Sequence, residues 1–311
     1  MLPKGIDMGI TIGVNAAGHI AAAVVEGEEI VNPINRFPGG DHEPDSLSNM
    51  PATEILEKLR QQISNTSDGR AVESVGIAFP GIIRNGVVEE CPNIPQMKGQ
   101  ELETALKYLL ATAGLGVKVH VLNDADAMAA GIAAARGHLD KIVRLWFLGS
   151  GIGFGRYPQT GGAGEGGHTV VSLDQKENLC SCGGAGHLEG IMGYRAMRLR
   201  FLDLEPDEVF EHARSGDPRC TEFVNLWHRA LAAATATSIH LDGPGKFFIS
   251  GPYAKFVDRE IVQLRLMEMV KMSPLQGSSV EVVHTTDEIA IVGAAISARQ
   301  PARDDGLPNE A

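Results

Sequence analysis

Apolar residues along the chain form short unbroken runs at first and then alternate with segments of helical period. Runs at 10–14, 20–25 and 28–31 are separated by tight polar turns, which predicts a three-stranded antiparallel start. Residues 32–51 are rich in Pro, Gly and Asp and predict a surface loop. Helical spacing then appears at 52–64, where Ile55, Leu56, Leu59 and Ile63 share one face.

From residue 74 onward, strand patterns alternate with helix patterns. The predicted strands are 74–79, 117–122, 142–148, 246–249 and 280–283. The predicted helices are 101–113, 125–136, about 254–272 and 288–299. The segment that follows residue 189 is also mostly helical, to about residue 240. This alternation predicts an α/β protein. Glycine-rich turns directly after strands mark the edge at which open α/β sheets bind ligands.

A chain of 311 residues favours two domains that share a cleft. We expect a small N-terminal domain at 1–122, joined by the C-terminal helix at about 288–300, a larger domain at 123–287 and a loose tail at 301–311. The net charge of −12 argues against a nucleic-acid partner, although backbone N–H groups and a metal can still hold a phosphate.

Cysteine content and hydropathy indicate the compartment. Four cysteines do not make a disulfide framework in a chain of this size. The first residues lack the apolar region of a signal peptide, and no apolar run reaches membrane-spanning length. We therefore expect a soluble, cytoplasmic protein with no membrane partner.

The segment 165–189 concentrates metal-binding side chains. His168, Cys180, Cys182 and His187 follow the spacing His-x11-Cys-x-Cys-x4-His. Two thiolates and two imidazoles suit a closed tetrahedral zinc site. Glu165 and Glu189 bracket the segment, so a bound ion would also fix these two carboxylates. The alternative is a glycine-rich loop with incidental polar residues.

Asn123 and Asp124 end a predicted strand and precede a predicted helix. A carboxylate at that point can face a cleft and accept the proton of a substrate hydroxyl. It can equally be a helix N-cap, because Asp and Asn are preferred there. Asp126 also competes, but its place in the first helical turn suits interaction with the helix dipole.

Glycine-rich turns suggest phosphate binding. Gly149, Ser150 and Gly151 follow a predicted strand, and their backbone amides and one hydroxyl can approach a phosphate. A glycine-rich β-hairpin is the alternative, and neither a Walker loop nor a Rossmann fingerprint fits. Gly251 closes another strand, and the small residues 292–295 permit either close nucleotide approach or tight helix packing.

Together these segments resemble the ROK family of sugar kinases, over about residues 12–298. The most specific match is Glu165-x-x-His168 followed by Cys180-x-Cys182-Gly-x-x-Gly-His187-x-Glu189. The segments 75–81, 91–93, 121–125 and 149–153 also occur in family order. The resemblance implies a two-domain actin/hexokinase-like (ribonuclease H-like) α/β fold with a cleft between the domains.

The resemblance also implies roles for individual residues. Asp124 is the expected catalytic base of an ATP-dependent sugar kinase. The expected sugar ligands are Asn93, Asn123, Glu165, His168 and Glu189. The expected structural zinc ligands are His168, Cys180, Cys182 and His187. ATP and Mg²⁺ are expected at the nucleotide-phosphate side, formed by Gly18, Gly149, Ser150, Gly151 and Gly251. A homodimer or higher homo-oligomer is expected as well.

Three positions depart from the family pattern. His187 stands where the family usually has Cys, and Ser150 where it usually has Thr. The family's opening Asp-x-Gly-Gly-Thr becomes Asn15-Ala-Ala-Gly-His19, which replaces a carboxylate by an amide. An upstream Asp7-Met-Gly-Ile-Thr resembles the motif but lies eight residues earlier, so we favour the register at Asn15.

These departures leave alternative functions open. The leading hypothesis is phosphorylation of a hexose or amino-hexose hydroxyl with ATP. The second is a sugar-binding protein of kinase fold that has lost or altered its use of nucleotides, and a third is different chemistry on the same sugar site. A repressor of the same family is disfavoured, because the first predicted strand begins near residue 10, where such proteins carry a helix-turn-helix.

Overall fold

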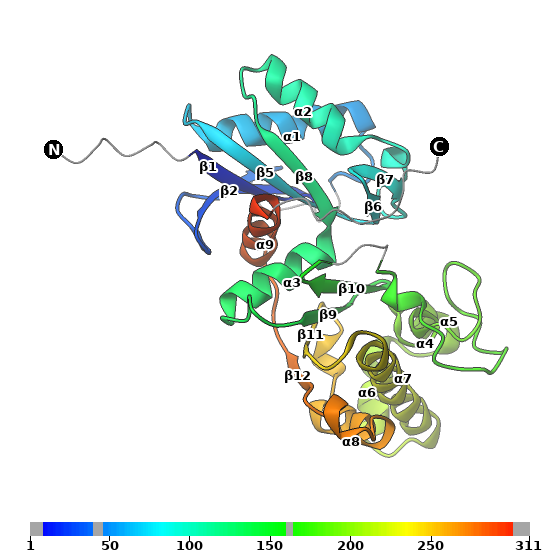
Figure 1. Cartoon of the computed structure of the whole chain (residues 1–311). Helices are drawn as coiled ribbons and strands as arrows, with labels where there is room; N and C mark the ends of the chain where they lie inside the picture. The colour runs from blue at the N-terminus through cyan, green and yellow to red at the C-terminus, as the bar shows by residue number, and fades with distance from the viewer. Residues whose placement is uncertain (1–8, 40–45, 160–163, 301–311) are drawn as a thin grey trace, which may run out of the picture. The chain divides into compact units, whose positions relative to one another are not determined.

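The computed structural model describes residues 9–39, 46–159 and 164–300. The chain forms two compact units, each built on its own sheet (Figure 1). The first unit comprises residues 1–139, 157–163 and 286–311, and the second comprises residues 140–156 and 164–285. The expected α/β organisation in two domains is therefore present. The tail at 301–311 lies outside the described residues.

The first unit holds a six-stranded sheet of order β3-β2-β1-β5-β8, with β4 paired to β2. Its strands are β1 (Ile10–Asn15), β2 (Ile20–Glu26), β3 (Glu29–Ile30), β4 (Asn35–Phe37), β5 (Val72–Phe79) and β8 (Lys118–Asn123). Antiparallel pairing of β1 with β2 and of β2 with β3 confirms the predicted three-stranded start. Strands β1, β5 and β8 run parallel, so Asn15 and Asn123 end at the same edge.

Helices cover both faces of this sheet (Figure 1). Helices α1 (Ala52–Ser67) and α2 (Leu102–Thr112) pack on one face through the apolar stripe predicted for α1. Helix α9 (Asp287–Arg299) lies on the other. Its close approach depends on two glycines that pair across β1 and β5. A Cβ on Gly13 would lie 2.0 Å from the carbonyl oxygen of Ile291, and one on Gly76 would lie 1.9 Å from that of Ala294.

Helix α3 (Asp124–Ala135) belongs to the first unit, because it packs against α9. A Cβ on Gly293 would lie 1.8 Å from the carbonyl oxygen of Ala127, so the small residues at 292–295 serve helix packing. The division between units accordingly follows residue 139, whereas the sequence placed it after residue 122. The difference arises because the contacts between α3 and α9 are far apart in sequence.

The second unit holds a four-stranded sheet of order β10-β9-β11-β12. Its strands are β9 (Val143–Leu148), β10 (Ile152–Tyr157), β11 (Lys246–Ser250) and β12 (Ser279–Val282). Its helices are α4 (Leu188–Met192), α5 (Tyr194–Arg200), α6 (Pro206–Arg214), α7 (Pro218–Asp242) and α8 (Arg259–Met269). Both tryptophans of the chain, Trp146 and Trp227, lie in its core.

Some segments differ from the sequence prediction. The predicted loop at 32–51 contains β4, and a hairpin of β6 (Ile82–Arg84) and β7 (Val87–Glu90) was not predicted. The helix predicted at about 254–272 begins only at Arg259, where Asp258 accepts hydrogen bonds from two backbone N–H groups as its N-cap. Short 3₁₀ turns occur at Pro95–Met97, Gly166–His168, Ala254–Phe256 and Ser273–Leu275. Among the described helices, none combines the length and the apolar character needed to cross a membrane.

Candidate active site

Asn123 and Asp124 stand where β8 ends and α3 begins. Asn123 is the N-cap: its Oδ1 accepts from the N–H groups of Ala125 and Asp126, and its Nδ2 donates to the carbonyl oxygen of Gly81 at 2.8 Å. The capping alternative therefore holds for Asn123. Asp124 is the first helical residue, and its Oδ1 accepts from the N–H of Ala125 at 2.9 Å.

The environment of Asp124 suits proton transfer. Burial raises the pKa of the Asp124 carboxyl, and the hydrogen bonds from the N–H groups of Ala125 and Asp124 only partly offset this. A carboxylate with a raised pKa is a stronger base. Burial also raises the pKa of the nearby Cys91 thiol to about 11, which keeps it protonated. Asn93, two residues later, is exposed.

The turn after β1 is occupied by a charged cluster. Asn15 Nδ2 donates to Asp287 Oδ1 at 2.9 Å, and His19 Nε2 lies 3.0 Å from the same oxygen. Arg36 Nε donates to Asp287 Oδ2 at 3.3 Å. Asp287 begins α9, and Gly18 within the turn accepts hydrogen bonds from Leu47 N–H and Ser46 Oγ through its carbonyl oxygen. Asn15 is the last residue of β1, the position that the favoured register gives it. Asp7, the alternative, lies outside the described residues.

These contacts set the charge of the cluster. Burial alone would raise the pKa of Asp287, but the hydrogen bonds from His19 and Asn15 outweigh it and lower the pKa to about 2. The hydrogen bond between His19 and Asp287 also raises the pKa of the His19 imidazole. Asn15 Oδ1 is buried and has no hydrogen-bond partner among the described residues. An amide flip does not remedy this, because it would turn that oxygen toward the Asp287 carboxylate.

Sequence reasoning missed His19, Arg36 and Asp287 as members of one cluster. His19 and Asp287 are 268 positions apart, and Arg36 and Asp287 are 251 apart. No local pattern encodes such a contact. The only signal was the departure at Asn15 itself, because an amide that replaces a carboxylate at a strand end needs a new partner.

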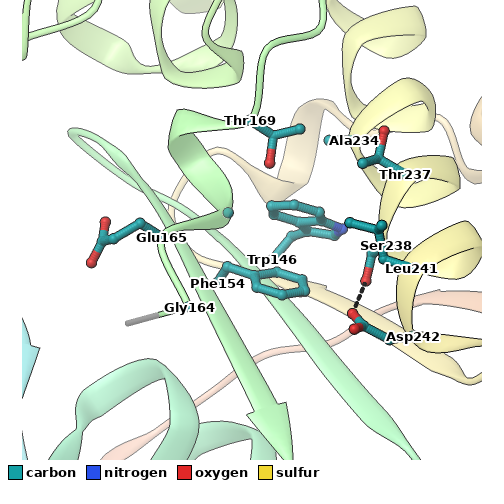
Figure 2. Close-up of a pocket in the computed structure, with 11 residues that line it drawn as sticks. Trp146, Phe154, Gly164, Glu165, Thr169, Ala234, Thr237, Ser238, Leu241 and Asp242 are labelled. Atoms are coloured by element: carbon teal, nitrogen blue, oxygen red, sulfur yellow. Dashed lines mark hydrogen bonds between the residues drawn. The ribbon is translucent and has the colours of Figure 1, made fainter. Parts of the chain in front are cut away.

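In the second unit, Glu165 precedes and His168 ends a 3₁₀ turn, Gly166–His168, that packs against β10. A Cβ on Gly166 would lie 2.6 Å from Phe154 Cβ, and one on Gly167 would lie 2.2 Å from the carbonyl oxygen of Ile152. Only glycines permit this contact, which sets the direction of both flanking side chains. Glu165 is exposed, and its carboxylate points away from the rings of Trp146 and Phe154 (Figure 2).

Figure 2 also shows a hollow behind Glu165, beside the C-terminal end of α7. It has a volume of about 210 Å³. Trp146 and Phe154 form one wall, with ring centroids 4.3 Å apart, and α7 supplies Thr237, Ser238 and Asp242. Glu165, Gly166 and Thr169 of the metal-binding segment also line it, but none of the four expected zinc ligands does.

The metal-binding side chains come together. Ligand atoms of His168, Cys180 and Cys182 lie within 4.8 Å of one another. Cys180 Sγ and Cys182 Sγ are 3.4 Å apart, and His187 Nδ1 is 3.3 Å from Cys182 Sγ. A bridge between Val170 and His187 places the rings of His168 and His187 in a stack 5.2 Å apart.

This arrangement fits a zinc ion. Zn–S bonds of about 2.3 Å and Zn–N bonds of about 2.0 Å give tetrahedral edges of roughly 3.5–3.8 Å. The observed S–S and S–N separations of 3.4 and 3.3 Å are close to these edges, and the two sulfurs are too far apart for a disulfide. Thiolate and imidazole are the ligands that zinc prefers. His168, Cys180 and Cys182 would hold the ion, and His187, beside Cys182, is the candidate for a fourth ligand.

Glu189 links the metal-binding segment to the glycine-rich turn. Its Oε1 accepts from Ser181 Oγ at 2.7 Å, and its Oε2 accepts from Ile152 N–H at 3.2 Å. Burial would raise the pKa of Glu189, but these hydrogen bonds hold it below its ordinary value. A Cβ on Gly151 would lie 2.4 Å from Glu189 Oε2. Gly151 therefore makes room for this carboxylate, whatever else it binds.

The other expected phosphate-binding residues gather at one edge of the second sheet. Gly149, Ser150 and Gly151 form the turn between β9 and β10, and Gly251 follows β11. Strands β9 and β11 are parallel neighbours, so both turns lie at their carboxyl ends. Ser150 is exposed. Gly251 has φ +98°, and a Cβ there would lie 2.4 Å from the carbonyl oxygen of Leu148.

Comparisons with known proteins identify the family of the chain. The model of the ROK family matches residues 5–300. The chain is 30% identical to a glucokinase of Thermotoga maritima over 285 residues, which is 81% of this chain and 87% of that protein.

Two solved structures share the fold. One is a ROK hexokinase from Thermus thermophilus, with a TM-score of 0.73, 23% identity, and coverage of 93% of this chain and 97% of that one. The other is a ROK family glucokinase from Streptomyces griseus in complex with glucose and AMPPNP, with a TM-score of 0.61 and 26% identity over 94% of this chain and all of that one. The chain therefore has the two-domain actin/hexokinase-like fold and belongs to the ROK family.

Proposed function

We propose that the protein transfers the terminal phosphoryl group of ATP to a hydroxyl of a hexose or amino-hexose. The observation that carries the proposal is the position of Asp124, a carboxylate with a raised pKa at the carboxyl end of β8. Relatives named glucokinase and kanosamine kinase, at 30% and 28% identity, support the same class of substrate.

In this proposal Asp124 accepts the proton of the attacking hydroxyl through its carboxylate. Glu165, His168 and Glu189 bind other sugar hydroxyls, with Asn123 and Asn93 as further ligands. Carboxylates accept hydrogen bonds from hydroxyls well, and a cross-linked loop would hold them without a large entropic cost. Zinc, when bound, supplies that cross-link. Mg²⁺ bound with ATP would neutralise phosphate charge.

Donor phosphates would bind at Gly149, Ser150, Gly151 and Gly251, with Gly18 on the other unit. The two turns of the second sheet offer backbone N–H groups and one exposed hydroxyl at adjacent strand ends. Phosphoryl transfer depends on positioning and charge neutralisation more than on covalent chemistry, so such a site needs no nucleophile of the protein.

A second candidate function is sugar binding without phosphoryl transfer. It is favoured by the cluster at Asn15, because the Asp287 carboxylate at the end of β1 is already engaged by Asn15, His19 and Arg36. A carboxylate so engaged is poorly placed to help a metal–phosphate group. This candidate retains the sugar ligands and Asp124 but not the donor.

The test is a coupled assay and calorimetry with glucose, mannose, glucosamine and N-acetylmannosamine, each with and without Mg-ATP. We expect a sugar phosphate as product for at least one sugar, and loss of product without loss of sugar binding in Asp124→Asn. Sugar binding without any turnover would instead select the second candidate. If no sugar binds, both candidates are wrong.

A further inference from the structure

Two tyrosines flank the turn at residues 149–151. The N–H of Tyr194 donates to the carbonyl oxygen of Gly149 at 3.4 Å, and the N–H of Tyr253 donates to that of Leu148 at 3.2 Å. Their rings stack with centroids 5.4 Å apart and an interplanar angle of 13°. Two segments 59 positions apart in the sequence thus deliver parallel aromatic rings to the same turn.

The backbone around both tyrosines fits closely against this turn. Gly193 is the N-cap of α5. A Cβ on Gly193 would lie 3.2 Å from the carbonyl oxygen of Ser150, so the two backbone segments are in close contact. Gly251, two residues before Tyr253, packs on Leu148 in the same way. Because both tyrosine-bearing segments pack on the turn, the rings have fixed positions relative to its N–H groups.

Further aromatic rings connect Tyr253 to the core of the second unit. Tyr253 lies 6.0 Å from Phe256, which stacks on Phe210 at 4.2 Å, and Phe210 meets the buried Trp227 edge-on at 5.2 Å. Both tyrosines keep part of their surface accessible. Among the ring contacts described, Tyr194 stacks only on Tyr253.

We propose that Tyr194 and Tyr253 form a stacking surface for the base of the donor nucleotide. The inference rests on the proposed function, and it concerns which donor is chosen. A phosphate held at Gly149–Gly151 places the rest of a nucleotide within reach of rings attached to the same turn. Flat, electron-rich rings stack on any base and gain nothing from an inorganic polyphosphate, which has no ring.

The test measures binding of ATP, AMP and inorganic tripolyphosphate by calorimetry to the full chain and to Tyr253→Ala, Tyr194→Ala, Tyr253→Phe and Tyr194→Phe. We expect each alanine variant to weaken ATP and AMP about tenfold or more, as loss of one base stack does. Tripolyphosphate binding should not change, and the phenylalanine variants should bind like the unmodified protein. Tyr108→Ala removes an exposed tyrosine of the other unit and serves as the control.

Other outcomes separate this inference from the kinase proposal. Unchanged ATP affinity in both alanine variants would overturn the stacking surface and leave the kinase proposal standing. An equal loss of ATP and tripolyphosphate would also overturn it, because the turn itself would then be damaged. If Tyr253→Ala weakens ATP selectively while no sugar is phosphorylated, the stacking surface stands and the kinase proposal fails. Melting temperatures within a few degrees of one another identify variants that are folded.

Discussion

In the proposed function, Asp124 combines catalytic and structural demands at a single residue. Its raised pKa means that the folded protein pays a free-energy cost to keep the carboxyl ionised. That cost is present at pH values above the raised pKa and disappears below the ordinary pKa of the side chain. An amide of the same shape carries no such cost, so the residue best suited to accept a proton is not the one best suited to stability.

We therefore expect Asp124→Asn to lose sugar phosphorylation by about 10²- to 10⁴-fold, the usual contribution of a general base. Its melting temperature near neutral pH should equal or exceed that of the unmodified protein. The difference in melting temperature should shrink as the pH falls toward the ordinary pKa of aspartate. Initial rates and thermal melts at several pH values check both parts, and a clear loss of stability near neutral pH would contradict the argument.

The contact between Asn15 and Asp287 offers a second test at single residues. Asn15→Asp would place two carboxylates about one hydrogen bond apart, so we expect a loss of about 1–3 kcal/mol in the free energy of unfolding. The double variant Asn15→Asp with Asp287→Asn restores one carboxylate and one amide and should recover most of it. Denaturant unfolding measures the cycle, and additive losses in the double variant would exclude direct contact.

The same cluster predicts how stability depends on pH. Asp287 has its pKa lowered to about 2, so its contribution is present above the unfolded pKa of 3.8 and is lost as the pH falls from 3.8 toward 2. The pKa of His19 is raised, so its contribution is present below 6.5 and is lost as the pH rises through the higher folded value. Both losses of stability come from the ion pair between His19 and Asp287. His19→Gln should remove the loss on the alkaline side in pH-dependent melts, whereas His240→Gln should not.

Among the elements, the segment 165–189 contains a 3₁₀ turn and the first residues of α4, and it gathers His168, Cys180 and Cys182, which could hold a metal ion. We expect Cys182→Ser to lower zinc content to well below half an equivalent and to expose the segment to proteolysis, since metal binding and local folding are coupled. Elemental analysis and limited proteolysis check this. Cys220→Ser removes a thiol outside the segment and should retain the metal, so equal zinc loss in both variants would refute the site.

Helix α9 depends on glycines of the sheet beneath it. Gly76→Ala places a Cβ 1.9 Å from a carbonyl oxygen of α9, which the backbone must relieve by moving. We expect a loss of at least about 1–3 kcal/mol, as for other overpacked positions. Gly116→Ala is the matched control, because a Cβ there meets nothing within 4 Å. Urea unfolding compares the two, and an equal effect would show that α9 can shift freely.

What the sequence predicted and what it missed follow from the range of the interactions. The junction of β8 and α3 was predictable, because an apolar run, an Asn cap and a helical pattern follow one another directly. Helix α8 was predicted to begin too early, since the apolar pattern passes over the cap at Asp258. The charged cluster at Asp287 could not be predicted, because its members meet only after the sheet and α9 have assembled.

At the scale of the whole molecule, the two units have separate sheets and separate cores, and the expected ligands are divided between them. Asp124, Asn123, Asn93 and Gly18 belong to the first unit, whereas the metal-binding segment and the turns at Gly149 and Gly251 belong to the second. The proposed activity therefore requires both units. Loss of the metal should perturb the second core directly and the first only indirectly.

Because Trp146 and Trp227 both lie in the core of the second unit, indole emission is a built-in reporter of that unit alone. The first unit contains no tryptophan, so its melting is silent at indole wavelengths, whereas far-ultraviolet dichroism reports the secondary structure of both units. A chelator titration followed in both signals would tell which half loosens first. The chain thus carries a label for one of its halves, without any dye.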